Sequence, residues 1–63
     1  MNFEEYLNSV RVNRACELLV STDASVMDIA LEVGYHNAKT LTRNFVKHKL
    51  MTPQSFRTAV MEG

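Results

Sequence analysis

A single glycine, Gly34, separates two short amphipathic segments, and this arrangement constrains the fold more than any other feature. Before the glycine, Ser25 can cap a helix whose apolar side chains recur at helical spacing. After it, Asn37 can cap a second helix that continues to about His48. Because glycine has no Cβ, it can adopt the left-handed conformation that ends a helix and reverses the chain. Residues 25–48 are therefore predicted to form two helices joined by a tight turn.

Two further helices are predicted beside this pair, and no stretch of the chain has the pattern of a strand. The first runs from Phe3 to about Leu19 or Val20, with Asn2 as its cap. The last covers residues 53–61 and begins with a threonine cap followed by proline at the first helical position. The predicted fold class is therefore all-α, a three- to four-helix domain with a homeodomain-like helix-turn-helix. The main inward-facing positions are expected to be Ala15, Leu18, Leu19, Val26, Ile29, Ala30, Val33, Tyr35, Leu41, Phe45, His48, Phe56 and Val60.

Size and charge narrow the class of protein further. At 63 residues the chain holds one small core, and its single cysteine, Cys16, excludes an internal disulfide. The lone thiol and the lack of a targeting segment indicate the reducing cytoplasm, and no apolar run reaches membrane length. The formal net charge is zero, but residues 1–32 carry six acidic and two basic side chains, whereas residues 33–63 carry five basic and one acidic. The positive charge is thus concentrated around the helix that follows the glycine.

The helix after the turn carries a stripe of basic side chains. Lys39, Arg43 and Lys47 follow one another at four-residue steps. They fall on the side of the helix opposite Leu41 and Phe45. A basic helix behind a tight turn is typical of proteins that place one helix in the major groove of DNA. The stripe alone also fits a solvated helix face, so the DNA interpretation depends on the motifs around it.

The other reactive side chains do not suggest a catalytic or metal site. His36 and His48 lack the spacing of metal ligands. Cys16 is interpreted as a packing residue rather than a redox thiol. No Ser/His/Asp set, acid pair or phosphate loop can be assembled from the remaining residues. The chain is therefore expected not to be an enzyme and to need no cofactor.

Two roles remain open for the arginines of the first helix. Arg11 and Arg14 could each bind a DNA phosphate. Pairing with neighbouring carboxylates such as Glu4 or Glu17 fits equally well, because side chains three or four residues apart meet on a helix. The sequence does not choose between these roles.

Five ordered motifs run through the chain. They are Phe3-x-x-Tyr6-Leu7-Asn8, Arg11-Val12-x-Arg14-Ala15-x-Glu17-Leu18-Leu19, Ser25-Val26-x-Asp28-Ile29-Ala30-x-Glu32-Val33-Gly34-Tyr35, Leu41-x-Arg43-x-Phe45 and Met51-Thr52-Pro53-x-x-Phe56-Arg57. Together they resemble the AraC/XylS family of bacterial transcription regulators. The resemblance spans nearly the whole chain, and it is specific because several motifs in order are far rarer by accident than one short pattern.

The resemblance implies a DNA-binding domain of two helix-turn-helix units joined by a long helix, which read successive segments of the major groove. This chain would be the joining helix, residues 1–20, with the second unit, 25–48, and its closing helix, 53–61. It would then be a fragment of a longer regulator, with a recognition helix at about 38–48. Lys47 is expected to contact the DNA backbone. The other DNA-binding positions implied by the resemblance hold Asn37, Ala38, Lys39, Thr40 and Arg43.

The sequence departs from the family pattern at the end of the recognition helix. An aromatic residue and then a glycine usually follow that helix, and this chain has Lys49 and Leu50 instead. A leucine enters the left-handed cap conformation only at a cost in free energy. The helix is therefore expected to overrun or to end in a looser turn, with Leu50 filling the space of the missing aromatic ring.

Sequence-specific binding of double-stranded DNA, as part of a transcription regulator, is the first function hypothesis. The alternative is a helical protein-interaction module that docks a sensor domain of the same chain or an RNA polymerase subunit through the acidic first helix. No membrane contact is expected. DNA binding by one unit alone should be weak and salt-dependent. Self-association is also expected, because the missing first unit would leave an apolar surface uncovered at Phe3, Tyr6, Leu7 and Val10.

Overall fold

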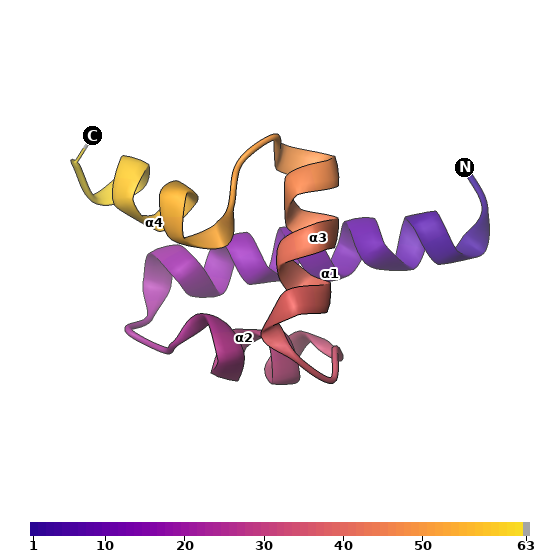
Figure 1. Cartoon of the computed structure of the whole chain (residues 1–63), viewed down its shortest axis with the longest axis horizontal. Helices are drawn as coiled ribbons and strands as arrows, with labels where there is room; N and C mark the ends of the chain where they lie inside the picture. Colours follow the sequence, from indigo (N-terminus) through magenta and orange to yellow (C-terminus); the bar gives the residue numbers. More distant parts are fainter. Residues whose placement is uncertain (63) are drawn as a thin grey trace.

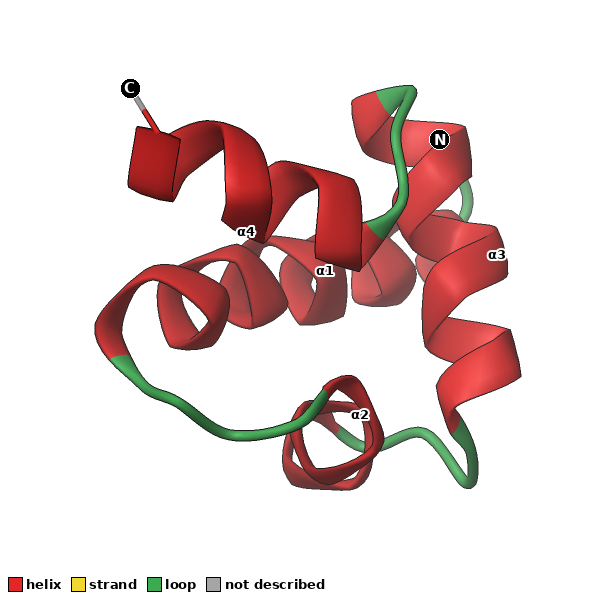
Figure 2. Cartoon of the chain, turned by 60° about the vertical axis from the view of Figure 1, so that its left-hand side comes forward, coloured by secondary structure: helices red, strands yellow, loops and turns green. Residues whose placement is uncertain are grey.

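Four helices make up the structure, which describes residues 1–62 of the chain. In this computed structural model they are α1 (Phe3–Ser21), α2 (Val26–Val33), α3 (Ala38–Lys49) and α4 (Pro53–Glu62). α1 runs along the whole molecule, α3 crosses it, and α4 lies beside its C-terminal half (Figure 1). Short loops connect the helices, and α2 lies on the other side of α1 from α4 (Figure 2). The all-α prediction is confirmed, and every helix lies close to its predicted bounds.

Each helix begins directly after the residue predicted to cap it. A side-chain oxygen accepts a hydrogen bond from a first-turn N–H that has no partner within the helix. Local sequence therefore determines where all four helices start. Four such hydrogen bonds are present: from the N–H of Glu5 to Asn2 Oδ1 (2.8 Å), of Asp28 to Ser25 Oγ (3.0 Å), of Thr40 to Asn37 Oδ1 (2.8 Å) and of Ser55 to Thr52 Oγ1 (3.1 Å).

The turn between α2 and α3 forms at Gly34, as predicted. Gly34 has a φ of 110° and lies in the left-handed region. Its N–H donates to the carbonyl of Leu31 at 3.2 Å, and the N–H of Tyr35 donates to the carbonyl of Ala30 at 2.8 Å. These two bonds are the Schellman pattern that closes a helix C-terminus. Tyr35 is then buried and holds the turn against the core.

The core lies where α1, α2 and α3 meet. Phe56 of α4 is half-buried and covers one end of the core. Its ring meets that of Phe45 edge to face, with centroids 5.6 Å apart and planes inclined at 68°. This is a favourable geometry for aromatic pairs. The buried apolar residues are Val12, Ala15, Leu19, Ile29, Ala30, Tyr35, Leu41 and Phe45.

A long-range contact that the sequence did not indicate attaches α4 to α1. Arg57 donates from Nε to the carbonyl of Leu19 and from Nη2 to the carbonyl of Thr22, both at 3.1 Å. The last turn of α1 has no basic residue of its own. Arg57 thus satisfies carbonyl groups at that helix end and places a positive charge at the negative end of the helix dipole.

Two expectations about side-chain burial are wrong, and one is confirmed. Val60 is 42% exposed rather than inward-facing, because α1 ends near Arg57 and Val60 lies one turn further along α4. Leu50 does not fill a space in the core and is 86% exposed. The N-terminal half of α1 is uncovered as expected, with Phe3 and Tyr6 78% and 59% exposed.

The end of α3 also differs from the expected overrun or looser turn. Leu50 adopts the left-handed conformation itself, with φ 63° and ψ 24°. Its N–H donates to the carbonyl of Val46 at 2.9 Å, which closes the helix. The chain must reverse here so that Pro53 and Phe56 can pack, and this packing offsets the left-handed backbone, which costs a leucine about 1–2 kcal/mol.

Candidate nucleic-acid interface

α3 is buried on one side and exposed on the other. Leu41 and Phe45 are fully buried beneath it. The side chains of Lys39, Arg43 and Lys47 are exposed on the opposite side and form what we term the basic face. Because the apolar side is anchored on α1 and α2, the basic face is held at a fixed position on the molecular surface.

The first turn of α3 contains a hydrogen-bond pair that limits what its side chains can donate. Asn37 Oδ1 accepts from the N–H of Thr40 and also from the Thr40 hydroxyl, at 2.8 Å and 3.0 Å. The hydroxyl proton of Thr40 is therefore engaged within the protein, and the oxygen is left as an acceptor. Ala38 is half-buried, so only part of its methyl group can touch a ligand.

A groove runs between the N-terminal half of α1 and the exposed side of α3. Glu4 and Asn8 contribute to its α1 wall, and Arg43 and Asn44 to its α3 wall. Asn44 donates from Nδ2 to the carbonyl of Thr40 at 3.0 Å, which fixes its amide group. Sequence reasoning overlooked Asn44 and the carboxylate of Glu4 beside the basic face. We call this feature the α1–α3 groove, and the residues considered below are Glu4, Asn8, Arg11, Thr40, Arg43 and Asn44.

The two arginines of α1 have different surroundings. Arg14 pairs with Glu17 at 2.9 Å, on the exposed side of the helix. The Arg11 guanidinium instead lies over the ring of Tyr35, 5.3 Å from its centroid. Tyr35 donates its hydroxyl to Asn8 Oδ1 at 2.8 Å. Burial raises the pKa of Tyr35 and the charge of Arg11 opposes that rise, so this hydroxyl stays protonated at neutral pH.

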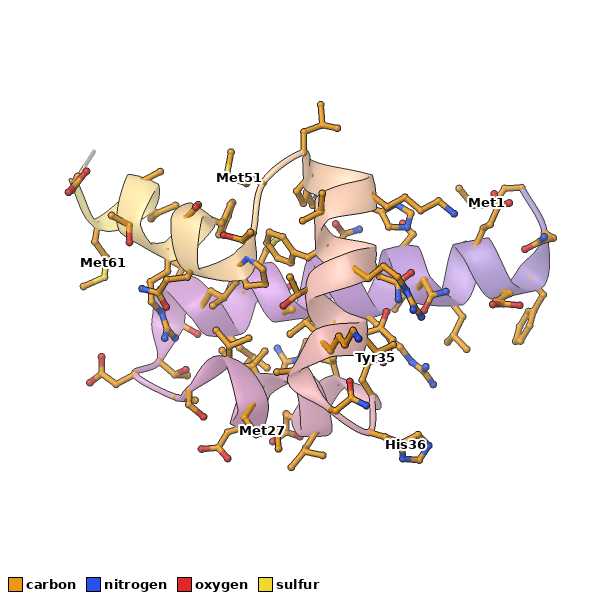
Figure 3. All side chains as sticks on the ribbon, viewed as in Figure 1. Met1, Met27, Tyr35, His36, Met51 and Met61 are labelled. Atoms are coloured by element: carbon orange, nitrogen blue, oxygen red, sulfur yellow. The ribbon has the colours of Figure 1, made fainter. Side chains whose placement is uncertain are left out.

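Cys16 and His36 lie in different surroundings within the described part of the chain. Cys16 is half-buried and packs against the core, as predicted. Desolvation is the main cause of its raised pKa, and this keeps the thiol protonated. His36 points away from the molecule, whereas Tyr35 lies near the crossing of α1 and α3 (Figure 3). Residues 1–62 contain no His, Cys, Asp or Glu cluster that could hold a metal ion. None of the helices in this range is long and apolar enough to span a membrane.

The fold and the exposed basic helix define a helix-turn-helix domain. A family model described as "Helix-turn-helix domain" matches residues 1–59. A solved structure, the C-terminal domain of the two-component response regulator yesN from Fusobacterium nucleatum, superposes with a TM-score of 0.86 at 30% identity. That match covers 90% of this chain and 55% of the other.

Curated relatives narrow the class to a family. The melibiose operon regulatory protein of Escherichia coli is 33% identical over 57 residues, and the probable transcription factor PqrA of Proteus vulgaris is 42% identical over 53 residues. The matches cover 90% and 84% of this chain. The chain belongs to the AraC/XylS family of bacterial helix-turn-helix transcription regulators. It spans only 19% and 43% of the length of these two relatives.

Proposed function

We propose that the chain binds double-stranded DNA sequence-specifically, with α3 in the major groove. The observation that carries this proposal is the basic face, which is exposed directly opposite two fully buried side chains, Leu41 and Phe45. A helix fixed in this way can enter a groove without losing its packing on the rest of the domain. Family membership supports the same conclusion.

Each residue of the proposed interface has its own chemistry. Arg43 can donate two parallel hydrogen bonds to guanine or grip a phosphate, and Lys39 offers a mobile positive charge. Thr40 is best suited to accept a hydrogen bond from a base amino group, because its hydroxyl proton is used by Asn37. Ala38 can contact a thymine methyl group, and the Asn37 amide lies at the same helix start. Lys47, one turn beyond Arg43, is assigned to the DNA backbone.

The relatives suggest the cellular context. The name of the Escherichia coli relative says that it regulates an operon, and we propose a comparable role in the bacterial cytoplasm for the regulator that contains this domain. Within such a regulator, α1 would correspond to the joining helix and α2 to α4 to the second helix-turn-helix unit. We also propose that this regulator contacts RNA polymerase or a sensor domain of the same chain.

Charge reversal on α3 tests the proposal. Arg43→Glu and Lys39→Glu should each weaken binding to a mixed-sequence duplex at least tenfold in low salt, because a repulsive charge replaces an attractive one at the phosphates. Fluorescence anisotropy of a labelled duplex measures the affinity. In the unmodified chain, amide shifts on adding duplex should centre on residues 38–47.

Lys49→Glu is the matched control. It makes the same charge change on the same helix, but Lys49 is half-buried and lies two residues past Lys47, roughly 200° further around the helix and therefore off the basic face. This variant should lose much less affinity than Arg43→Glu. Equal losses in both variants, or amide shifts confined to α1 and α4, would contradict the assignment of the basic face.

A second candidate function is protein docking through α1. The exposed Phe3 and Tyr6 stand beside Glu4 and Glu5, which together form an apolar and acidic surface. Glu5→Lys should weaken the binding of a protein partner and leave binding of short duplex DNA unimpaired. Loss of partner binding in Arg43→Glu but not in Glu5→Lys would count against this second candidate.

A further inference from the structure

We infer that Arg11 of α1 is a DNA-phosphate contact beside the recognition helix, an inference that rests on the proposed function of α3. Arg11 and Arg43 come from different helices but line the same α1–α3 groove, together with Thr40 and Asn44. A helix in the major groove has a sugar-phosphate backbone along each flank. A cation that stands beside the helix, rather than on it, is placed to meet one of those backbones.

The surroundings of Arg11 leave its charge available to an anion. The ion pair between Arg14 and Glu17 is the one that the structure shows within residues 1–62, so Arg14 is already neutralised and Arg11 is not. The Tyr35 ring contacts Arg11 in cation–π geometry. A guanidinium placed over an aromatic ring still has N–H groups that can donate, and these match the geometry of phosphate oxygens.

The same contact holds Arg11 in place before DNA binds. Tyr35 is 6% exposed, and its hydroxyl is fixed by Asn8 of α1. The Gly34 turn also lies against Arg11, since a Cβ at Gly34 would come within 3.1 Å of Arg11 Nε. A side chain confined in this way loses less conformational entropy on binding than a free lysine would.

Glu4 sets a limit on the strength of this site. It lines the same groove, and its carboxylate repels a phosphate. Replacing it with glutamine keeps the shape and removes the charge. Glu4→Gln should therefore tighten duplex binding by severalfold at low salt, provided that a phosphate enters the groove.

The test measures how binding depends on salt in variants with matched charge changes. The probe is a fluorescein-labelled duplex of mixed sequence, about two helical turns long. Loss of one phosphate contact lowers the slope of log affinity against log salt by about 0.9. Arg11→Gln should show this decrease, as should Lys47→Gln, which removes the α3 residue assigned to the DNA backbone. Arg14→Gln removes the same charge from the same helix and should leave the slope unchanged.

The outcomes separate this inference from the proposed function. A normal slope in Arg11→Gln with a reduced slope in Lys47→Gln overturns the role of Arg11 alone, and normal slopes in both overturn DNA binding by α3. Arg11→Lys keeps the charge, so it should restore the slope. If Arg11→Gln fails to fold, the Nε–H resonance of Arg11 in the unmodified chain decides, because it must shift on adding duplex, and an unmoved resonance refutes the contact.

Discussion

Within residues 1–62, two residues have a positive φ, and each ends a helix, but at a different cost in free energy. Gly34 and Leu50 have φ values of 110° and 63°. Leu50 is 86% exposed, so its side chain adds little packing. Leu50→Gly is therefore expected to raise the free energy of unfolding by about 0.5–1 kcal/mol. Relief of the left-handed strain exceeds the entropy that glycine adds to the unfolded chain. Urea unfolding followed by circular dichroism measures the change.

Two further substitutions separate backbone strain from side-chain effects. Leu50→Ala keeps a Cβ and should change stability by less than about 0.5 kcal/mol. Gly34→Ala should lower stability by about 1–3 kcal/mol, because alanine is strained at this φ and its Cβ approaches Arg11. The strain explanation for Leu50 fails if the alanine variant gains as much stability as the glycine variant.

At the scale of helices, α4 has few buried apolar side chains, and its attachment to α1 depends strongly on Arg57. Apart from Pro53 and Phe56, the helix is largely exposed, and Arg57 bonds two carbonyls at the end of α1. Arg57→Met should lower the free energy of unfolding by about 1–3 kcal/mol, the range for lost hydrogen bonds to a charged group. Thermal melting should show a drop of roughly 4–8 °C for each kcal/mol.

Arg14→Met is a suitable comparison for Arg57→Met. It also replaces an arginine by an apolar chain of similar length, but it removes an exposed ion pair, which contributes less than about 1 kcal/mol. Similar losses in both variants would mean that the Arg57 bonds add nothing beyond a surface charge.

The helices and the outline of the site were predictable because their determinants are local. Each cap bonds a residue three positions away, and Gly34 ends α2 through its own backbone. Arg57 contacts residues 35 and 38 positions earlier in the chain, and no local pattern indicates such a pair. The choice between roles for Arg11 and Arg14 likewise required Tyr35, which reaches α1 only in the folded chain. At Leu50 the local sequence was misleading, because tertiary packing imposed a left-handed backbone that leucine disfavours.

At the scale of the whole molecule, the main exposed apolar surface is the N-terminal half of α1. This segment extends beyond α3, and it exposes Phe3, Tyr6 and Val10 at 78%, 59% and 45% (Figure 1). A domain of 63 residues buries too little surface to be strongly stable, so covering this face should stabilise it noticeably. We expect the chain to self-associate through this face at high concentration.

Self-association should appear as a melting temperature that rises with protein concentration. A tenfold increase changes the free energy of a dimer by about 1.4 kcal/mol, which corresponds to an increase of several degrees. The double variant Phe3→Ser and Tyr6→Ser removes apolar surface that is mostly exposed within residues 1–62. It should therefore melt at one temperature at every concentration and match the unmodified chain at high dilution. Sedimentation of the unmodified chain as a monomer throughout this concentration range would show that the face stays open to solvent.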